Sequence, residues 1–65
     1  MKIKQLLSRL LIGVSNIYLV EVMRYGKLID TIERTEILEQ DYHDLGDEKI
    51  NSFAILGTKI VVHIG

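Results

Sequence analysis

The chain has 65 residues and a mass of 7.5 kDa, and it contains no cysteine, proline or tryptophan. We expect one domain, residues 1–65, and the missing cysteines exclude disulfides, thiolate metal sites and thiol catalysis. Hydrophobic residues make up 48% of the chain and charged residues 26%, which is typical of a folded globular protein and not of a disordered one. So much apolar surface in so small a chain predicts a homo-oligomer, and we expect a dimer.

Charge is unevenly distributed along the sequence, although the net charge is only −1. Residues 1–29 hold five basic residues and one acid, whereas residues 30–48 hold eight of the nine acids and one basic residue. The acidic segment either forms a solvated face or meets a basic partner. A third alternative is contact between the acidic segment of one chain and the basic segment of another within an oligomer.

The sequence predicts neither a targeting segment nor a membrane span. Its basic start is followed by an apolar stretch, but Arg9 interrupts this stretch and no small-residue cleavage site follows. The longest nearly apolar run, Leu10 to Val20, is much shorter than the roughly 20 residues that a membrane-spanning helix needs. We therefore expect a cytoplasmic protein without membrane contact.

The first predicted elements are a helix and a hairpin. Over residues 2–12, apolar side chains recur at three- and four-residue steps, which predicts an amphipathic helix. Gly13 follows as its C-terminal stop. Residues 17–24 are rich in β-branched and aromatic types and predict a strand. The turn Tyr25-Gly26-Lys27 then leads to a return strand over residues 28–33.

A change of period predicts a second helix over residues 35–45. Leu38, Tyr42 and Leu45 fall at steps of four and three, and Thr35 is a candidate N-cap. A strand that continues through Leu38 is the competing interpretation.

Two further strands, residues 49–56 and 59–64, are predicted to form a hairpin around a type II′ turn at Gly57-Thr58. The element order α-β-β-α-β-β predicts an α+β fold. It should have a four-stranded, largely antiparallel sheet with one or two helices on one face.

Alternation and helical spacing together predict the core. The expected core residues are Leu6, Leu7, Leu10, Tyr18, Val20, Val22, Ile32, Leu38, Tyr42, Phe53, Ile55, Ile60 and Val62. Apolar residues left over on the first strand, namely Ile17, Leu19 and Met23, would be available for self-association.

Groups that could carry catalysis are scarce. The only histidines are His43 and His63, and no Gly-x-Ser-x-Gly elbow is present, so we do not expect a catalytic triad. Paired carboxylates such as Glu36 and Glu39 are better explained as a solvated helix face than as an acid–base pair. A chain of this size also has little volume for a substrate cleft. We therefore predict that the protein is not an enzyme and has no catalytic residues.

The segment that begins at Asp41 partly matches the pattern of a calcium-binding EF-hand loop. Gly46 falls at the required sixth position, but the third, fifth and twelfth positions hold a histidine, a leucine and a serine. A chance contact of a divalent ion with Asp41, His43 and Asp47 is the remaining metal interpretation. The simpler one is a helix end with Gly46 as its stop, so we predict no metal site and no cofactor.

A nucleic-acid interface would have to use the basic half of the chain. Its candidate phosphate-contacting residues are Lys2, Lys4, Arg9, Arg24 and Lys27. They lack interleaved aromatic residues, and the acidic half would repel the same polymer. Direct nucleic-acid binding is therefore not expected, although it is kept as a third functional hypothesis.

The opening Met1-Lys2-Ile3-Lys4-Gln5-Leu6-Leu7 resembles the start of small uncharacterised accessory proteins from phages and mobile elements of low-GC Gram-positive bacteria. The similarity extends over the layout of the whole chain: a short helix, a hairpin, an acidic middle and a closing hairpin. The apolar stretch from Ile12 to Asn16 departs from it. The resemblance transfers no functional residue. It implies a bacterial host cell and an anti-defence function, as in small acidic anti-CRISPR proteins.

The leading functional hypothesis is a non-enzymatic inhibitor whose acidic surface occupies the basic, nucleic-acid-binding groove of a host protein. The predicted partner-binding residues are Glu33, Glu36, Glu39, Asp41, Asp44, Asp47 and Glu48, with Tyr42 as an anchor or core residue. The alternative is a homo-oligomeric protein with a structural or assembly role, or one that sequesters a small ligand between its chains.

Overall fold

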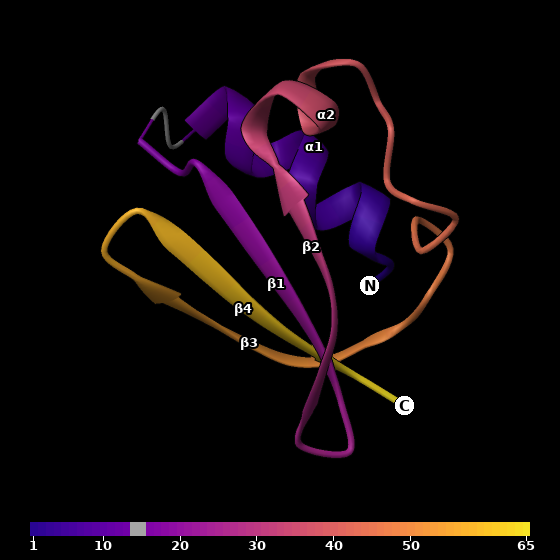
Figure 1. Cartoon of the computed structure of the whole chain (residues 1–65). Helices are drawn as coiled ribbons and strands as arrows, with labels where there is room; N and C mark the ends of the chain where they lie inside the picture. Colours follow the sequence, from indigo (N-terminus) through magenta and orange to yellow (C-terminus); the bar gives the residue numbers. More distant parts are fainter. Residues whose placement is uncertain (14–15) are drawn as a thin grey trace.

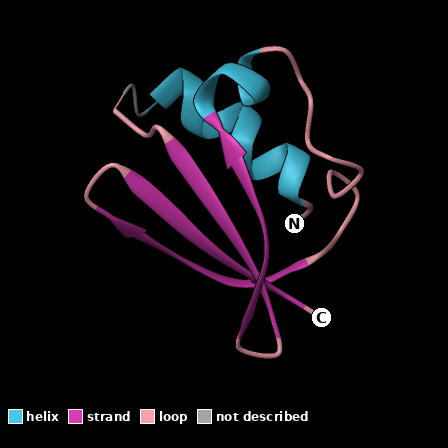
Figure 2. Ribbon diagram, in the orientation of Figure 1, coloured by secondary structure: helices cyan, strands magenta, loops and turns pink. Residues whose placement is uncertain are grey.

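A computed structural model describes residues 1–13 and 16–65 of the chain (Figure 1). In chain order the elements are α1 (Ile3–Gly13), β1 (Leu19–Arg24), β2 (Lys27–Glu33), α2 (Arg34–Leu38), β3 (Ile50–Leu56) and β4 (Lys59–Ile64). The strands form one sheet in the order β2-β1-β4-β3. Both hairpins are antiparallel, whereas the central strands β1 and β4 run parallel. Both helices lie on the same side of the sheet (Figure 2), so the predicted α+β fold and element order are confirmed.

The hydrophobic core lies between α1 and the central strands. Alternate residues of β1 and β4 face the helix, as the two-residue period of a strand requires. The buried residues are Ile3, Leu6, Leu7, Ile17, Val20, Val22, Ile32, Ile37, Ile60, Val62 and Ile64. None of the described helices is long and apolar enough to cross a membrane.

Both hairpin turns form where they were predicted. Tyr25 and Gly26 both adopt positive φ angles, 51° and 76°, as a two-residue type I′ turn requires. Gly57 has a φ of 64° at the first position of the second turn, in agreement with a type II′ turn.

The second helix is much shorter than predicted, because α2 ends at Leu38. A Schellman motif closes it: the Gln40 N–H donates to the Ile37 carbonyl (3.0 Å), and the Asp41 N–H donates to the Glu36 carbonyl (2.8 Å). Gln40 takes the left-handed conformation of this motif, with a φ of 59°. The spacing of apolar residues could not reveal this stop, because glutamine is not a typical residue at that position.

The start of α2 also differs from the prediction. Glu33, not Thr35, is the N-cap residue. The Glu36 side chain reaches back to accept the Glu33 backbone N–H at 3.0 Å, which satisfies one of the donors left free at a helix start.

Four of the residues expected in the core are exposed. Tyr18 lies outside, where its ring is covered by the Arg34 guanidinium at 5.4 Å, and Leu38 points to solvent at the end of α2. Phe53 and Ile55 are 45% and 48% exposed, because β3 is an edge strand with a neighbouring strand on one side only. Tyr42 is only partly buried against the core.

The other predicted core residues are buried wherever the structure describes their side chains. Leu10 is not among the residues whose side chains are described. Ile17, which was expected to be left over for association, is instead buried in the core, whereas Leu19 and Met23 are half-buried on the opposite sheet face. The buried residues Ile3, Ile37 and Ile64 were not in the predicted set.

Candidate functional site

The long connection between α2 and β3, residues 39–49, lies against the start of α1. Its backbone carbonyls accept hydrogen bonds from α1: Ile3 N–H donates to Glu48, and Lys4 N–H donates to Gly46, both at 3.0 Å. These amides belong to the helix start, where no carbonyl of the helix itself is available. The connection is therefore a fixed part of the fold and holds its side chains in defined places.

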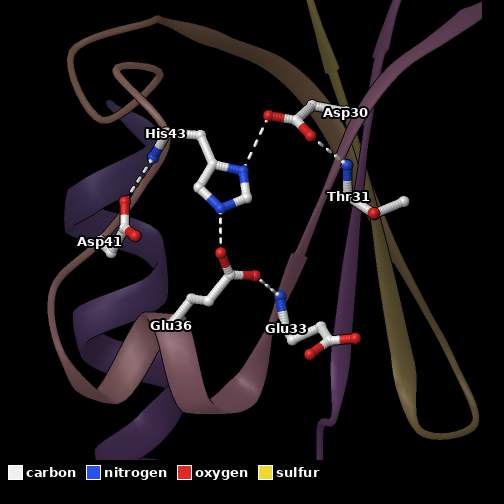
Figure 3. A network of polar contacts seen from close by, with 6 residues as sticks. All are labelled: Asp30, Thr31, Glu33, Glu36, Asp41 and His43. Carbon is white, nitrogen blue, oxygen red and sulfur yellow. Dashed lines mark hydrogen bonds and ion pairs between the residues drawn. The ribbon is translucent and has the colours of Figure 1, made fainter.

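His43 lies within this connection between two carboxylates from other elements (Figure 3). Its Nδ1 is 2.9 Å from Asp30 Oδ2 on β2, and its Nε2 contacts Glu36 Oε2 on α2. Asp30 Oδ1 also accepts the Thr31 N–H at 2.8 Å, and Glu36 also accepts the Glu33 N–H. His43 thus joins the connection to β2 and α2. We call Asp30, Glu36 and His43 the histidine clamp.

The electrostatics of the clamp favour a charged imidazole. Hydrogen bonds to Glu36 and Asp30, in that order, raise the pKa of His43 from 6.5 to about 9, against the opposing effect of desolvation. The pKa of Glu36 is lowered, first by the Glu33 backbone N–H and then by His43. At neutral pH both ring nitrogens therefore donate protons to carboxylates. A ring in this state has no free lone pair, so it cannot act as a general base.

A metal-ligand geometry overlaps the histidine clamp. Glu36, Asp41 and His43 each offer one ligand atom, and these atoms lie within 4.8 Å of one another. Of the trio considered from the sequence, only Asp41 and His43 come together, because Asp47 binds lysines instead. A metal ion would have to replace a proton on the His43 ring, and the ring protons already balance the carboxylates.

An open hollow of about 360 Å³ lies between the connection and the start of α1. It is lined by Lys4, Gln40, Asp41, Tyr42, Asp44, Gly46 and Asp47. Within it, Lys4 Nζ is 2.7 Å from Asp47 Oδ1, and this contact, with help from Lys2, lowers the pKa of Asp47. Three carboxylates and one ammonium group line the hollow, so it carries an excess of negative charge. It can accept a cationic group more readily than an anion.

The seven predicted partner-binding residues fall into two groups. Three of them form ion pairs within the chain. Glu36 pairs with His43, Asp47 pairs with Lys4 and Lys2, and Glu48 pairs with Arg24 at 2.9 Å. The remaining four are exposed and have no lysine or arginine partner in the described part of the chain: Glu33, Glu39, Asp41 and Asp44. Only this second group is available to another molecule without breaking an ion pair.

The basic residues of the first half are partly neutralised by the same connection. Lys2 and Lys4 pair with Asp47, and Arg24 pairs with Glu48, so three of the five candidate phosphate-contacting residues have carboxylate partners. The acid–base contact that was considered between two chains thus forms within one chain.

Sequence reasoning missed the role of Asp30 and the way His43 is held. From the sequence, His43 was weighed only as a catalytic residue or a metal ligand, and Asp30, thirteen residues earlier, only as part of the return strand and of the acidic segment. The available signal was a histidine inside a strongly acidic segment, which favours an ion pair but does not identify the partners.

Comparison of this chain with protein-family models, with curated proteins and with solved structures found no match.

Proposed function

We propose that the chain is a non-enzymatic binding protein whose exposed carboxylates meet a basic surface of a partner protein. The observation that carries this proposal is that some carboxylates of the acidic segment form ion pairs within the chain and others do not. Glu39, Asp41 and Asp44 are exposed on a connection that is fixed to α1, and no lysine or arginine of the described chain neutralises them. Charges held on a fixed surface favour fast, salt-sensitive association with an oppositely charged one.

The hollow supports a basic partner in particular. Asp41 and Asp44 line it together with Tyr42, so it combines carboxylates with an aromatic wall. Lysine and arginine side chains are suited to such a setting, because their cationic heads pair with carboxylates and their stems pack on apolar surface. Surfaces built for nucleic-acid phosphates are rich in both residues. The proposed partner is a host defence protein, and its nucleic-acid-binding groove is the proposed contact surface.

The histidine clamp supports the non-enzymatic part of the proposal. Its only histidine has both ring nitrogens engaged by carboxylates, so it holds the surface in place instead of moving protons. Direct nucleic-acid binding has less support, because Lys2, Lys4 and Arg24 are paired with carboxylates.

The test compares capture of proteins from a bacterial lysate by the immobilised wild type and by the variant Glu39→Gln/Asp41→Asn/Asp44→Asn. These near-isosteric changes remove three negative charges and keep side-chain oxygens as acceptors. We expect the wild type to capture a basic protein that added DNA or moderate salt releases, and the variant to lose it.

A matched control gives the same change in net charge at another surface. Gln5→Lys, Ser8→Lys and Asn16→Lys alter three exposed positions outside the connection and should leave capture intact. Equal loss with the control would mean that only net charge matters. Retention by the folded triple variant would show that the carboxylates are not the contact surface. Either result contradicts the proposal.

A further inference from the structure

The sheet has one edge that differs strongly from the other. β3 forms the outer edge next to β4 (Figure 1), and its sequence INSFAIL contains neither a charged residue nor proline. The opposite edge strand, β2, has the sequence KLIDTIE and carries three charged residues. Natural edge strands are commonly protected from pairing by charge, proline or a bulge. In β3 the irregularity lies between Ile50 and Ser52, which leaves residues 52–56 regular and uncharged.

Both faces of this regular segment expose apolar side chains. Phe53 and Ile55 pair with the buried Val62 and Ile60, so they share the helix-covered face, but they lie beyond the edge of the core. Leu56 is exposed on the opposite face. An added strand beside β3 would therefore extend the existing core by one row and satisfy the outward N–H and C=O groups of the edge.

We propose that residues 52–56 of β3 pair antiparallel with the same segment of a second copy of this chain, with Ala54 opposite Ala54 across a twofold axis. In this register Phe53 of each copy lies opposite Ile55 of the other, on the helix-covered face. Burying a charged side chain against this uncharged edge would cost free energy, so an uncharged partner strand suits it best, and a second copy of the chain presents one. A twofold contact places the same patch on both copies, as closed dimers require. This inference does not rest on the proposed function.

The expected strength follows from the size of the contact. Half of an aromatic side chain contributes about 100 Å², so three half-exposed apolar residues and a short backbone ladder bury less than the ~800 Å² per partner of a standard interface. The dimer should therefore depend on concentration, with a dissociation constant between about 1 μM and 1 mM. Because residues 52–56 carry no charge, the dissociation constant should change little with salt.

Sedimentation equilibrium of the full chain tests the proposal, over about 1 μM to 1 mM protein and in about 50 and 500 mM NaCl. Ala54→Lys places two ammonium groups directly opposite each other across the twofold axis, and like charges in that position destabilise a strand pair. We expect its dissociation constant to rise at least about tenfold. The matched control is Leu28→Lys, which adds the same charge at an exposed position of the opposite edge strand, and its dissociation constant should equal that of the wild type.

Circular dichroism establishes that each variant is folded, and Ser52→Lys replaces Ala54→Lys if the latter does not fold. A wild type that stays monomeric throughout overturns the proposal. So does a folded β3 variant that dimerises as well as the wild type, or an equal weakening by Leu28→Lys. Strong weakening of the wild-type dimer by salt would also overturn it, since that behaviour belongs to contacts between charged segments.

Discussion

Replacing His43 with glutamine should remove the charge of the histidine clamp and alter how stability depends on pH. The raised pKa means that the folded state binds the His43 proton more tightly than the unfolded state does. The resulting stabilisation is fully present below pH 6.5, decreases as pH rises towards about 9, and is absent above that value. At the acid end, the lowered pKa of Glu36 adds stability that is present above its ordinary pKa of 4.5 and is lost as pH falls below it.

The magnitude follows from the same geometry. A rise of the His43 pKa from 6.5 to about 9 corresponds to at most about 3 kcal/mol of unfolding free energy. The His43 side chain is 25% exposed, and the carboxylates of Asp30 and Glu36 are 35% and 32% exposed. Solvent screening of groups this accessible reduces the expected contribution to about 1 kcal/mol.

Urea unfolding of the wild type and His43→Gln at several pH values measures this contribution, provided that unfolding is two-state. We expect the wild type to be more stable by about 1 kcal/mol near pH 6 and the difference to disappear above pH 9. His63→Gln is the matched control, since His63 is exposed and forms no ion pair in the described part of the chain. A constant difference between wild type and His43→Gln from pH 6 to pH 10 would refute the assignment of a charged clamp.

Three substitutions test the packing and the turns, each by urea unfolding. Leu7→Ala removes a fully buried side chain and should lower the unfolding free energy by about 2–5 kcal/mol, a large part of the total for a domain of this size. Tyr25→Asn should raise it by about 0.5–1 kcal/mol, because asparagine tolerates the positive φ of 51° better than tyrosine does. Gly46→Ala would place a Cβ 3.1 Å from the Tyr42 ring and should cost about 1 kcal/mol.

The hairpins and α1 could be predicted from the sequence because their signals are local. Gly57 needs only its own positive φ to favour the turn, and alternation alone assigns Ile60 and Val62 to the buried face. The parallel pairing of β1 with β4 is different, since it joins segments about 40 residues apart and leaves no local signature. Without the strand order, Phe53 and Ile55 look like core residues, although they lie on an edge.

The acidic segment can be recognised from the sequence, but the sequence does not show which of its acids form ion pairs. Composition identifies eight acids in residues 30–48. Nothing local distinguishes Asp44, which has no lysine or arginine partner among the described residues, from Asp47, which binds Lys4 near the start of the chain. The same limit applies to His43, whose partners are fixed by where α2 ends. The Schellman motif at Gln40 ends that helix early and directs the connection back across the molecule.

The early end of α2 links the fold to both proposals. In a helix continuing to residue 45, the backbone carbonyls would bond within the helix, and fewer residues would remain to reach the start of α1. Because the chain turns at Gln40, residues 46 and 48 supply carbonyls to α1, and Asp47 and Glu48 reach basic side chains. Glu39, Asp41 and Asp44, which have no lysine or arginine partner among the described residues, lie on this fixed connection, whereas β3, which follows, is an edge strand of the sheet. The contact with a basic partner and the contact between copies can therefore be altered by separate substitutions, and each can fail without the other.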